Sequence, residues 1–286
     1  MTSQETTSPH DLDMPAPVNL YDHAYGKYEL DVYREVRIET YGEDLGQTSW
    51  VSTEESKQIP VWLKLAPTSA VLEIGSGSGR YALRIAESVG CHITGLDINA
   101  LGIGNANQLA RELKLEKLAR FEQCDVAQGL PFANEAFDGA FSNDVVCHIP
   151  NRPALLSELF RVLKPAARLL VSDALVIGGI LSHEEIAIRS SVGYYAFSPP
   201  GENERLLTAA GFRILRVMDT SENAAGIAKR RHNARAKRKN ALSAAEGEAN
   251  FEGLQRFLSS VHTLTSERRL LRFVYIAEKE GARPQA

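Results

Sequence analysis

The chain has 286 residues, 44% of them hydrophobic and 24% charged, a balance typical of a folded globular protein and not of a disordered or collagen-like chain. Its 36 acidic and 32 basic side chains give a formal net charge of -4, so no overall field draws it to nucleic acid or to an anionic membrane. The longest apolar stretch, residues 174–181, is less than half of a membrane span. Three cysteines without a C-x-x-C pair indicate a reducing compartment, and we expect a cytoplasmic protein.

The N-terminal part of the chain predicts a tail followed by a helical cap. Residues 1–18 are rich in Ser, Thr, Pro and Asp and predict a disordered tail. Residues 19–50 alternate tyrosines with charged residues and predict one or two short helices. Thr53, followed by two glutamates, is typical of an N-cap, and its helix is expected to run to about Leu65. We therefore expect residues 19–66 to form an N-terminal helical cap.

From Ala70 onward, short apolar runs alternate with amphipathic stretches. The apolar runs predict strands at 70–74, 92–96, 119–123, 137–142, 168–172, 212–218 and 272–277. The amphipathic stretches predict helices at 79–88, 101–115, 153–163 and 203–210. Strands separated by helices require right-handed crossovers, and hence a mostly parallel sheet with helices on both faces.

The predicted fold is one doubly wound α/β domain, residues 67–286, with a seven-stranded, mostly parallel, Rossmann-like sheet whose last strand is antiparallel. Residues 219–269 separate the last two strands and predict a helical insertion of two helices divided near Gly247. The sequence leaves two roles open for this insertion, a lid over the site and a homodimer interface.

The most informative segment is Val71-Leu-Glu-Ile-Gly-Ser-Gly-Ser-Gly79, an apolar strand that breaks into three alternating glycines before a helix. Glycines let the backbone turn sharply and approach a ligand closely. The dinucleotide fingerprint is G-x-G-x-x-G, whereas here the third glycine comes one residue earlier and Glu73 precedes Gly75 by two positions. A carboxylate beside the turn repels a diphosphate but suits a ligand with an ammonium or sulfonium group.

Two more acids follow at predicted strand ends. Asp97 ends the second strand, where an acid can accept hydrogen bonds from both hydroxyls of a ribose. Asp125 ends the third strand, where an adenine would lie beside the switch point of the sheet. With Glu73 and the glycine turn, these acids fit an adenosine that bears a cationic tail.

These motifs resemble those of the class I S-adenosylmethionine-dependent methyltransferases, and the likeness extends over residues 21–278. The resemblance implies S-adenosylmethionine as cofactor, with Gly75 and Gly77 under its methionine part, Asp97 at the ribose, and Asp125 with Val126 at the adenine. The cofactor-binding residues expected in full are Gln47, Glu73, Gly75, Gly77, Gly79, Asp97, Ile98, Asp125, Val126 and Asn143. No metal is expected.

Within that family, the pattern looks like the small-molecule N-methyltransferases of the glycine, sarcosine, dimethylglycine and phosphoethanolamine type. Residues 41–45 (YGEDL) resemble their G-E-D-I segment, and residues 143–149 (NDVVCHI) resemble their acid and histidine after the fourth strand. The chain departs from this subgroup at Gly46, where a histidine is common. The resemblance favours methyl transfer to an amine nitrogen of a small molecule. The alternatives are C- or O-methylation of a small molecule such as a prenyl diphosphate, RNA methylation, and a non-catalytic cofactor-binding role.

Methyl transfer depends mainly on positioning, but an amine must present a free lone pair, so a base near neutrality helps. His148 is the candidate base, and Asp144 is placed to orient it or to pair with a cationic substrate. Simple packing or capping of a turn is the alternative for both residues. Candidate substrate-binding residues, for which ordinary packing is likewise the alternative, are Tyr21, Tyr25, Trp50, Tyr194 and Tyr195.

Seven basic residues lie between Lys229 and Lys239 with no acid among them. They suit RNA or an anionic substrate, or else form a solvated helical face. The run contains no aromatic residue to stack on bases, which favours the solvated face.

Overall fold

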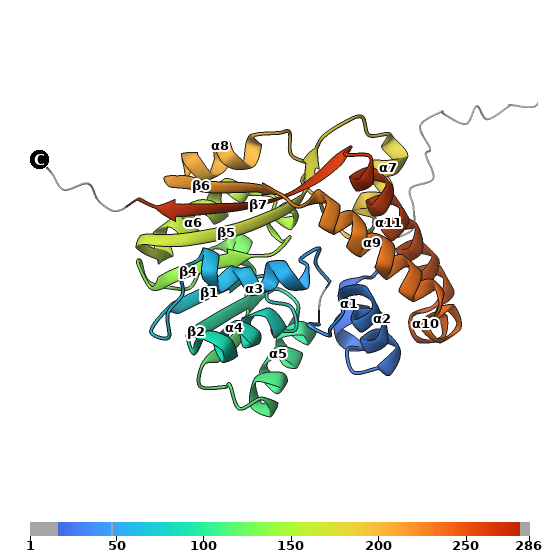
Figure 1. Ribbon diagram of the computed structural model, residues 1–286, viewed down its shortest axis with the longest axis horizontal. Coiled ribbons are helices and arrows are strands. Elements are labelled where there is room, and N and C mark those ends of the chain that lie inside the picture. Colours follow the sequence, from blue (N-terminus) through green and yellow to red (C-terminus); the bar gives the residue numbers. More distant parts are fainter. Residues whose placement is uncertain (1–16, 47, 281–286) are drawn as a thin grey trace, which may run out of the picture.

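The computed structural model describes residues 17–46 and 48–280, so most of the predicted tail and Gln47 lie outside the described residues. The chain forms a seven-stranded sheet in the order β3-β2-β1-β4-β5-β7-β6 (Figure 1). The strands from β3 to β5 pair in parallel, and β7 is antiparallel to both of its neighbours. The strands are β1 (Ala70–Ile74), β2 (His92–Asp97), β3 (Ala119–Gln123), β4 (Phe137–Ser142), β5 (Leu163–Ile177), β6 (Phe212–Asp219) and β7 (Leu270–Lys279). The predicted seven-stranded doubly wound fold is confirmed.

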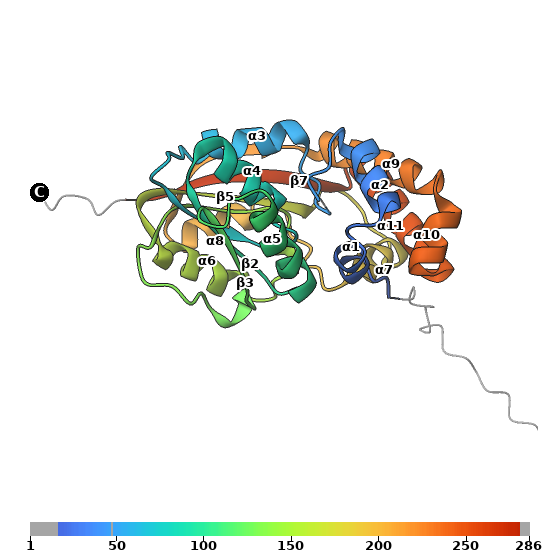
Figure 2. The ribbon, with the colours of Figure 1, turned by 90° about the horizontal axis from the view of Figure 1, so that it is seen from below.

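Helices cover both faces of this sheet (Figure 2). On one face lie α3 (Thr53–Trp62), α4 (Arg80–Val89) and α5 (Ala100–Glu112), which share one apolar cluster with the strands. On the other face lie α6 (Arg152–Val162) and α8 (Glu202–Ala209), which share a second cluster. Two buried apolar layers around one sheet make the central scaffold rigid.

Two local details differ from the sequence prediction. The N-cap of α3 is Ser52 and not Thr53, because the Ser52 hydroxyl accepts the hydrogen bond from the Glu55 backbone N–H. Strand β5 is longer at both ends than predicted, and its pairing with β4 shifts register between Phe137 and Gly139. The extra length at the C-terminal end pairs with β7, a contact between segments about a hundred residues apart that local periodicity does not contain.

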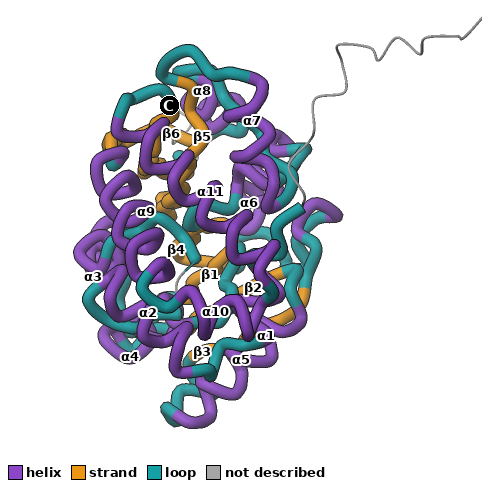
Figure 3. The backbone as a smooth tube through the Cα atoms, turned by 90° about the vertical axis from the view of Figure 1, so that its right-hand side faces the viewer, coloured by secondary structure: helices purple, strands orange, loops and turns teal. Residues whose placement is uncertain are grey.

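The remaining helices gather at one end of the sheet, beyond the carboxyl ends of its parallel strands (Figures 1 and 3). They are α1 (Tyr21–Gly26), α2 (Asp31–Tyr41), α7 (His183–Arg189), α9 (Ser221–Ala236), α10 (Lys239–Glu246) and α11 (Glu248–Ser266), and the short 3-10 turns are Val126–Gln128, Val146–His148 and Ser190–Val192. The insertion divides at Gly247 as predicted, but it contains three helices, because the chain breaks again between α9 and α10. Among the described residues, no helix is long and apolar enough to cross a membrane.

The basic run of the insertion pairs with the N-terminal cap. Arg238 contacts Glu35 and Glu39 of α2 at 2.9 and 2.8 Å, and Lys237 also pairs with Glu39. Arg235 is buried and pairs with Glu246. Lys237 and Arg238 therefore hold the insertion against the cap, whereas Arg235 pairs within the insertion. The expectation of a solvated face is wrong for Arg235 and Arg238, but the Lys237 side chain is 66% exposed.

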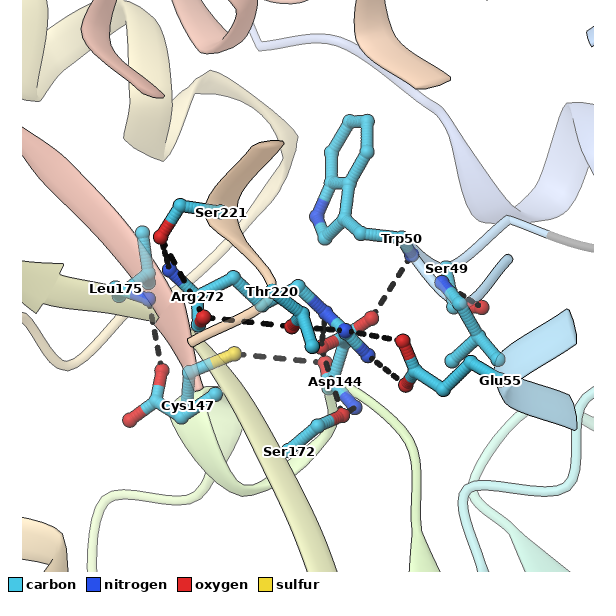
Figure 4. Close-up of polar contacts among 12 residues, drawn as sticks. Ser49, Trp50, Glu55, Asp144, Cys147, Ser172, Leu175, Thr220, Ser221 and Arg272 are labelled. Atoms are coloured by element: carbon cyan, nitrogen blue, oxygen red, sulfur yellow. Dashed lines mark hydrogen bonds and ion pairs between the residues drawn. The ribbon is translucent and has the colours of Figure 1, made fainter. Parts of the chain in front are cut away.

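A buried arginine links the last strand to the loop after β4 (Figure 4). Arg272 on β7 is fully buried, and its guanidinium donates two hydrogen bonds of 2.8 Å to the Glu55 carboxylate on α3. Its Nε donates a third bond of 2.8 Å to Oδ1 of Asp144, just after β4. Burial alone would lower the pKa of Arg272, but the two carboxylates raise it overall, so the guanidinium stays charged.

Asp144 is held on all sides by this network. Its Oδ1 also accepts from the Ser172 hydroxyl at 2.8 Å, and its Oδ2 accepts from the Trp50 backbone N–H at 2.8 Å. Its backbone adopts φ 58°, a left-handed conformation that costs a residue with a side chain some free energy. The network therefore sets the path of the chain on leaving β4.

Replacing Arg272 with methionine leaves the carboxylates of Asp144 and Glu55 buried without their cation. We expect Arg272→Met to lower the free energy of unfolding by about 3 kcal/mol or more, measured by urea denaturation. The control Arg205→Met, which removes an exposed pair with Glu202, should leave it nearly unchanged. Equal stability of the two variants would contradict this role of Arg272.

Candidate active site

A cavity of about 1280 Å³ lies between the carboxyl ends of the parallel strands and the helices of the cap and insertion. Its walls come from the glycine turn after β1, the ends of β2, β3 and β4, helix α1, and the segment after α7. Carboxyl ends at a switch point are where open α/β sheets bind ligands. The cavity brings together most of the residues that the sequence singled out.

The glycine turn forms the floor of this cavity. Gly75, Gly77 and Gly79 all have positive φ, of 75°, 52° and 76°. A Cβ on Gly75 would overlap a methyl group of Val145, and one on Gly77 would lie 2.5 Å from the Tyr25 hydroxyl oxygen. Only glycine therefore fits this turn at these positions.

The two acids at strand ends line the same cavity. Asp97 accepts hydrogen bonds from the backbone N–H groups of Gly77 at 2.7 Å and Asn99 at 2.8 Å, which fixes the acid against the turn. Burial raises the pKa of Asp97 above its usual value. Asp125 is exposed and accepts from the Ala127 N–H at 3.0 Å. Both residues line the cavity.

Unsatisfied polar atoms surround the cavity. Ser76 Oγ and both amide atoms of the Asn143 side chain are buried and have no hydrogen-bond partner among the described residues. Since buried polar groups are nearly always paired, these atoms suit a ligand rich in donors and acceptors. The neighbouring Ile98 is 66% exposed, and Val126 is buried, so together they offer an apolar surface for an adenine. The residues present fit S-adenosylmethionine.

Glu73 and Gly79 lie behind the cavity wall and not in it. Glu73 is 1% exposed, and its Oε2 has no hydrogen-bond partner in the described chain. Desolvation and the nearby Asp97 raise its pKa well above the usual value. Gly79 begins α4 and packs against Ala106 and Phe121, so its part is to admit the helix close to the sheet.

His148 and Tyr21 form a hydrogen-bonded pair at the cavity wall. His148 Nδ1 lies 3.0 Å from the Tyr194 carbonyl, which can only accept, so this nitrogen carries the proton. His148 Nε2 lies 3.0 Å from the Tyr21 hydroxyl and therefore accepts its hydrogen bond. Burial, together with the charge of Arg189, lowers the pKa of His148 to about 4. The imidazole is thus neutral near pH 7, with its basic nitrogen engaged by Tyr21.

The predicted roles of Asp144 need correction. Its carboxylate oxygens are bonded to Arg272, Ser172 and the Trp50 N–H, and the hydrogen bonds of the His148 ring go to other residues. Asp144 therefore does not orient His148 directly, and its charge is already balanced by a buried guanidinium. Asp144 instead fixes the backbone after β4, in the segment that leads to His148.

Four of the five predicted substrate-binding aromatic residues line the cavity, namely Tyr21, Tyr25, Trp50 and Tyr195. The Tyr195 ring lies 4.4 Å from the His148 ring between centroids, and Trp50 packs on Phe257 of α11 at 6.3 Å. Tyr194 differs, because its side chain is 54% exposed outside the cavity and its backbone carbonyl makes the contact with His148. Helix α11 of the insertion thus contributes Phe257 to the lining of the pocket.

Sequence reasoning missed Arg189 and Arg272. Arg189 lies at the end of α7, is 1% exposed, and lines the cavity. A charged residue inside the apolar strand 270–277 was a usable signal for Arg272, because a buried charge demands a partner. No local pattern marks Arg189. Within the described part of the chain, no group of three His, Cys, Asp or Glu side chains is arranged to hold a metal ion.

Comparison with known proteins agrees with this geometry. Residues 65–192 match the family model of a methyltransferase domain. An O-methyltransferase of Pyrenophora dematioidea is 31% identical over 162 residues, 56% of this chain and 60% of that protein. The glycine/sarcosine/dimethylglycine N-methyltransferase of Actinopolyspora halophila is 26% identical over 204 residues, 71% of this chain and 35% of that protein. The chain spans less than two thirds of the length of both relatives.

Two solved structures share the fold. Phosphoethanolamine N-methyltransferase 2 of Haemonchus contortus, in complex with phosphomonomethylethanolamine and S-adenosylhomocysteine, superposes with a TM-score of 0.76 at 20% identity, over 91% of this chain and 60% of that one. The [4+2]-cyclase SpnF superposes with a TM-score of 0.73 at 21% identity, over 93% and 99%. At such identities the likeness shows the fold alone.

Residues 65–192 are similar to a methyltransferase domain, and the described chain has the fold of the class I methyltransferases. The match agrees with the resemblance predicted from the sequence over these residues. The relatives act on both oxygen and nitrogen, so they do not select the acceptor atom.

The low pKa of His148 predicts a pH-dependent contribution to stability. Since the folded pKa of about 4 lies below that of the unfolded chain, the unfolded state binds more protons between these values, and stability falls as pH falls. From about pH 7.5 to about pH 5, the wild type should lose about 2 kcal/mol more unfolding free energy than His148→Gln. Urea titrations at both pH values measure this difference. The variant His92→Gln, at the exposed start of β2, is the control for the loss of an imidazole. If wild type and His148→Gln lose the same unfolding free energy between the two pH values, the prediction is contradicted.

Proposed function

We propose that the protein transfers the methyl group of S-adenosylmethionine to an amine nitrogen of a small molecule. The observation that carries the proposal is the Tyr21–His148 pair, at 3.0 Å, in the wall of the cavity formed with the glycine turn. When bound, S-adenosylmethionine supplies an electrophilic methyl group: the nitrogen forms the C–N bond as the methyl–sulfur bond breaks, and the bonding electron pair stays on sulfur. The protein must then hold the nitrogen in line and remove its proton.

In this proposal the cofactor lies along the carboxyl edge of the sheet. Gly75, Gly77 and Asn143 contact its methionine part, Asp97 accepts from the ribose hydroxyls, and Asp125 meets the adenine. Ile98 and Val126 flank the adenine, while Glu73 supports the turn from behind. Gln47 keeps its predicted place in the set, although it lies outside the described residues.

The Tyr21–His148 pair moves the proton. The Tyr21 hydroxyl oxygen accepts a proton from the substrate nitrogen while its own proton passes to Nε2 of His148, which is neutral at physiological pH. The Tyr194 carbonyl keeps the imidazole oriented by accepting from Nδ1. Aromatic faces of Tyr25, Trp50 and Tyr195 suit an ammonium group by cation–π contact.

An oxygen acceptor is the second candidate. The same pair can accept the proton of a hydroxyl group, and the relative in Pyrenophora dematioidea is an O-methyltransferase. Nitrogen is supported as the acceptor atom by the relative in Actinopolyspora halophila and by the Haemonchus contortus structure, because both proteins are named as N-methyltransferases.

The test is a mass-spectrometric screen of the protein with S-adenosylmethionine against matched sets of small amines and of alcohols. We expect amine products heavier by one methyl group, formed with equal amounts of S-adenosylhomocysteine. Tyr21→Phe and His148→Gln should each lower kcat by about 100-fold or more, since general base catalysis contributes about that much, whereas His92→Gln should not. Products only among the alcohols would overturn the nitrogen assignment, and full activity of Tyr21→Phe would overturn the proton route.

A further inference from the structure

A second, much smaller cavity lies between the cap and the insertion. Helices α2 and α9 pack against each other there (Figure 2), and the space between them has a volume of about 20 Å³. We call it the arginine cavity, because its lining includes Arg37, Arg231 and Arg235, each at most 8% exposed. Gly46 and Thr48 line both this cavity and the candidate active site. The arginine cavity therefore gathers buried positive charge next to the active site.

The carboxylates paired with these arginines do not balance the charge of the arginine cavity. Arg37 pairs with Asp44 at 2.7 Å, and Arg235 pairs with Glu246. Arg231 forms no ion pair within residues 17–46 and 48–280. Three guanidiniums against two carboxylates leave one positive charge in excess. A buried charge of this kind is costly unless an opposite charge accompanies it.

Hydrogen-bond donors of the arginine cavity are also unsatisfied. Nε of Arg235 and Oγ1 of Thr40 are buried and have no hydrogen-bond partner among the described residues. Both residues belong to the lining, and they are 2% and 1% exposed. Arg231 donates from Nη1 to the Thr48 carbonyl over a long 3.3 Å. Since a guanidinium only donates hydrogen bonds and a hydroxyl can donate one, the missing partner is a hydrogen-bond acceptor.

The two arginines of α9 repel each other. Arg231 and Arg235 are four residues apart on this helix, so they project from the same face, where like charges destabilise. Burial, together with the positive charge of Arg231, lowers the pKa of Arg235, although the Glu246 carboxylate opposes this shift. A negative charge beside both guanidiniums would relieve the repulsion, whereas a neutral water molecule would not.

The volume of the arginine cavity limits what can fill it. A water-sized particle needs about 10–15 Å³, so the cavity has room for a monatomic ion and not for a phosphate or a carboxylic acid. We propose that the arginine cavity binds one chloride ion, held by the guanidiniums of Arg231 and Arg235 and by the hydroxyl of Thr40. The ion cancels the excess charge and connects α9 of the insertion to α2 of the cap. This site is separate from the methyl acceptor and from the cofactor.

The first test measures the melting temperature of the full chain at constant ionic strength while sodium chloride replaces sodium gluconate, whose anion is too large for the cavity. We expect the melting temperature to rise with chloride and then to level off, because a ligand that binds only the folded state stabilises it by mass action. The concentration dependence gives an apparent Kd for chloride. A wild-type melting temperature that is the same in both salts would overturn the proposal.

Three variants assign the effect to the arginine cavity. Arg231→Met should abolish the chloride dependence, and Thr40→Val, which keeps the side-chain shape, should raise the apparent Kd about tenfold. Arg189→Met is the matched control, since Arg189 is also a buried arginine but lines the other cavity, and it should keep the wild-type Kd. A chloride dependence that persists in Arg231→Met, or that disappears in Arg189→Met alone, would overturn the proposal.

The second test does not depend on the stability of any variant. In crystals of the wild type grown with bromide in place of chloride, the anomalous signal of bromine marks the ion. We expect an anomalous peak between Arg231, Arg235 and Thr40. Electron density in the arginine cavity without an anomalous signal would identify a water molecule and overturn the proposal, as would bromide peaks that lie only elsewhere in the molecule.

Discussion

The fully buried Arg272 guanidinium is the interaction on which the arrangement of the cavity depends. It joins β7 to α3 through Glu55 and to the end of β4 through Asp144, three segments that are far apart in the sequence. Asp144 in turn fixes the Trp50 backbone, so the cap segment and the loop that carries Asn143 and His148 are set by one charge cluster. Breaking such a buried cluster is costly, and the cavity wall is therefore preorganised before any ligand arrives.

Acidic and basic side chains of this protein lie in separate parts of the fold, which the net charge does not reveal. The net charge of -4 conceals acids at the strand ends, a basic insertion paired with the acidic face of α2, and the buried Arg189 guanidinium in the cavity. The pairing holds the insertion over the carboxyl edge of the sheet, where α11 contributes Phe257 to the pocket. The cavity then carries carboxylates along the proposed adenosine path and the Arg189 guanidinium beside the Tyr195 ring.

The sequence predicted the scaffold because its signals are local. Apolar runs such as 70–74 and 119–123 mark strands with their observed bounds, and the glycine turn is readable because only glycine fits at Gly75 and Gly77. Features that depend on long-range contacts were not readable. Glu55 and Arg272, which pair in the structure, are 217 positions apart in the sequence. Because Arg272 also binds the Asp144 carboxylate, Asp144 does not orient His148, and no local pattern indicates this. Arg189 looks like an ordinary last-turn helix cation until the fold buries it between Tyr195 and Phe257.

The central claim is that the turn after β1 holds S-adenosylmethionine, and the affinity of two glycine variants for S-adenosylhomocysteine tests it most directly. Gly77 has a backbone φ of 52°, and a Cβ added there would lie 2.5 Å from the Tyr25 hydroxyl oxygen. A Cβ added at Gly104 in α5 would meet nothing within 4 Å. The account predicts that Gly77→Ala, folded by circular dichroism, binds S-adenosylhomocysteine at least tenfold more weakly than the wild type in calorimetric titration, while Gly104→Ala binds it equally well. Equal affinity in both variants would contradict the account.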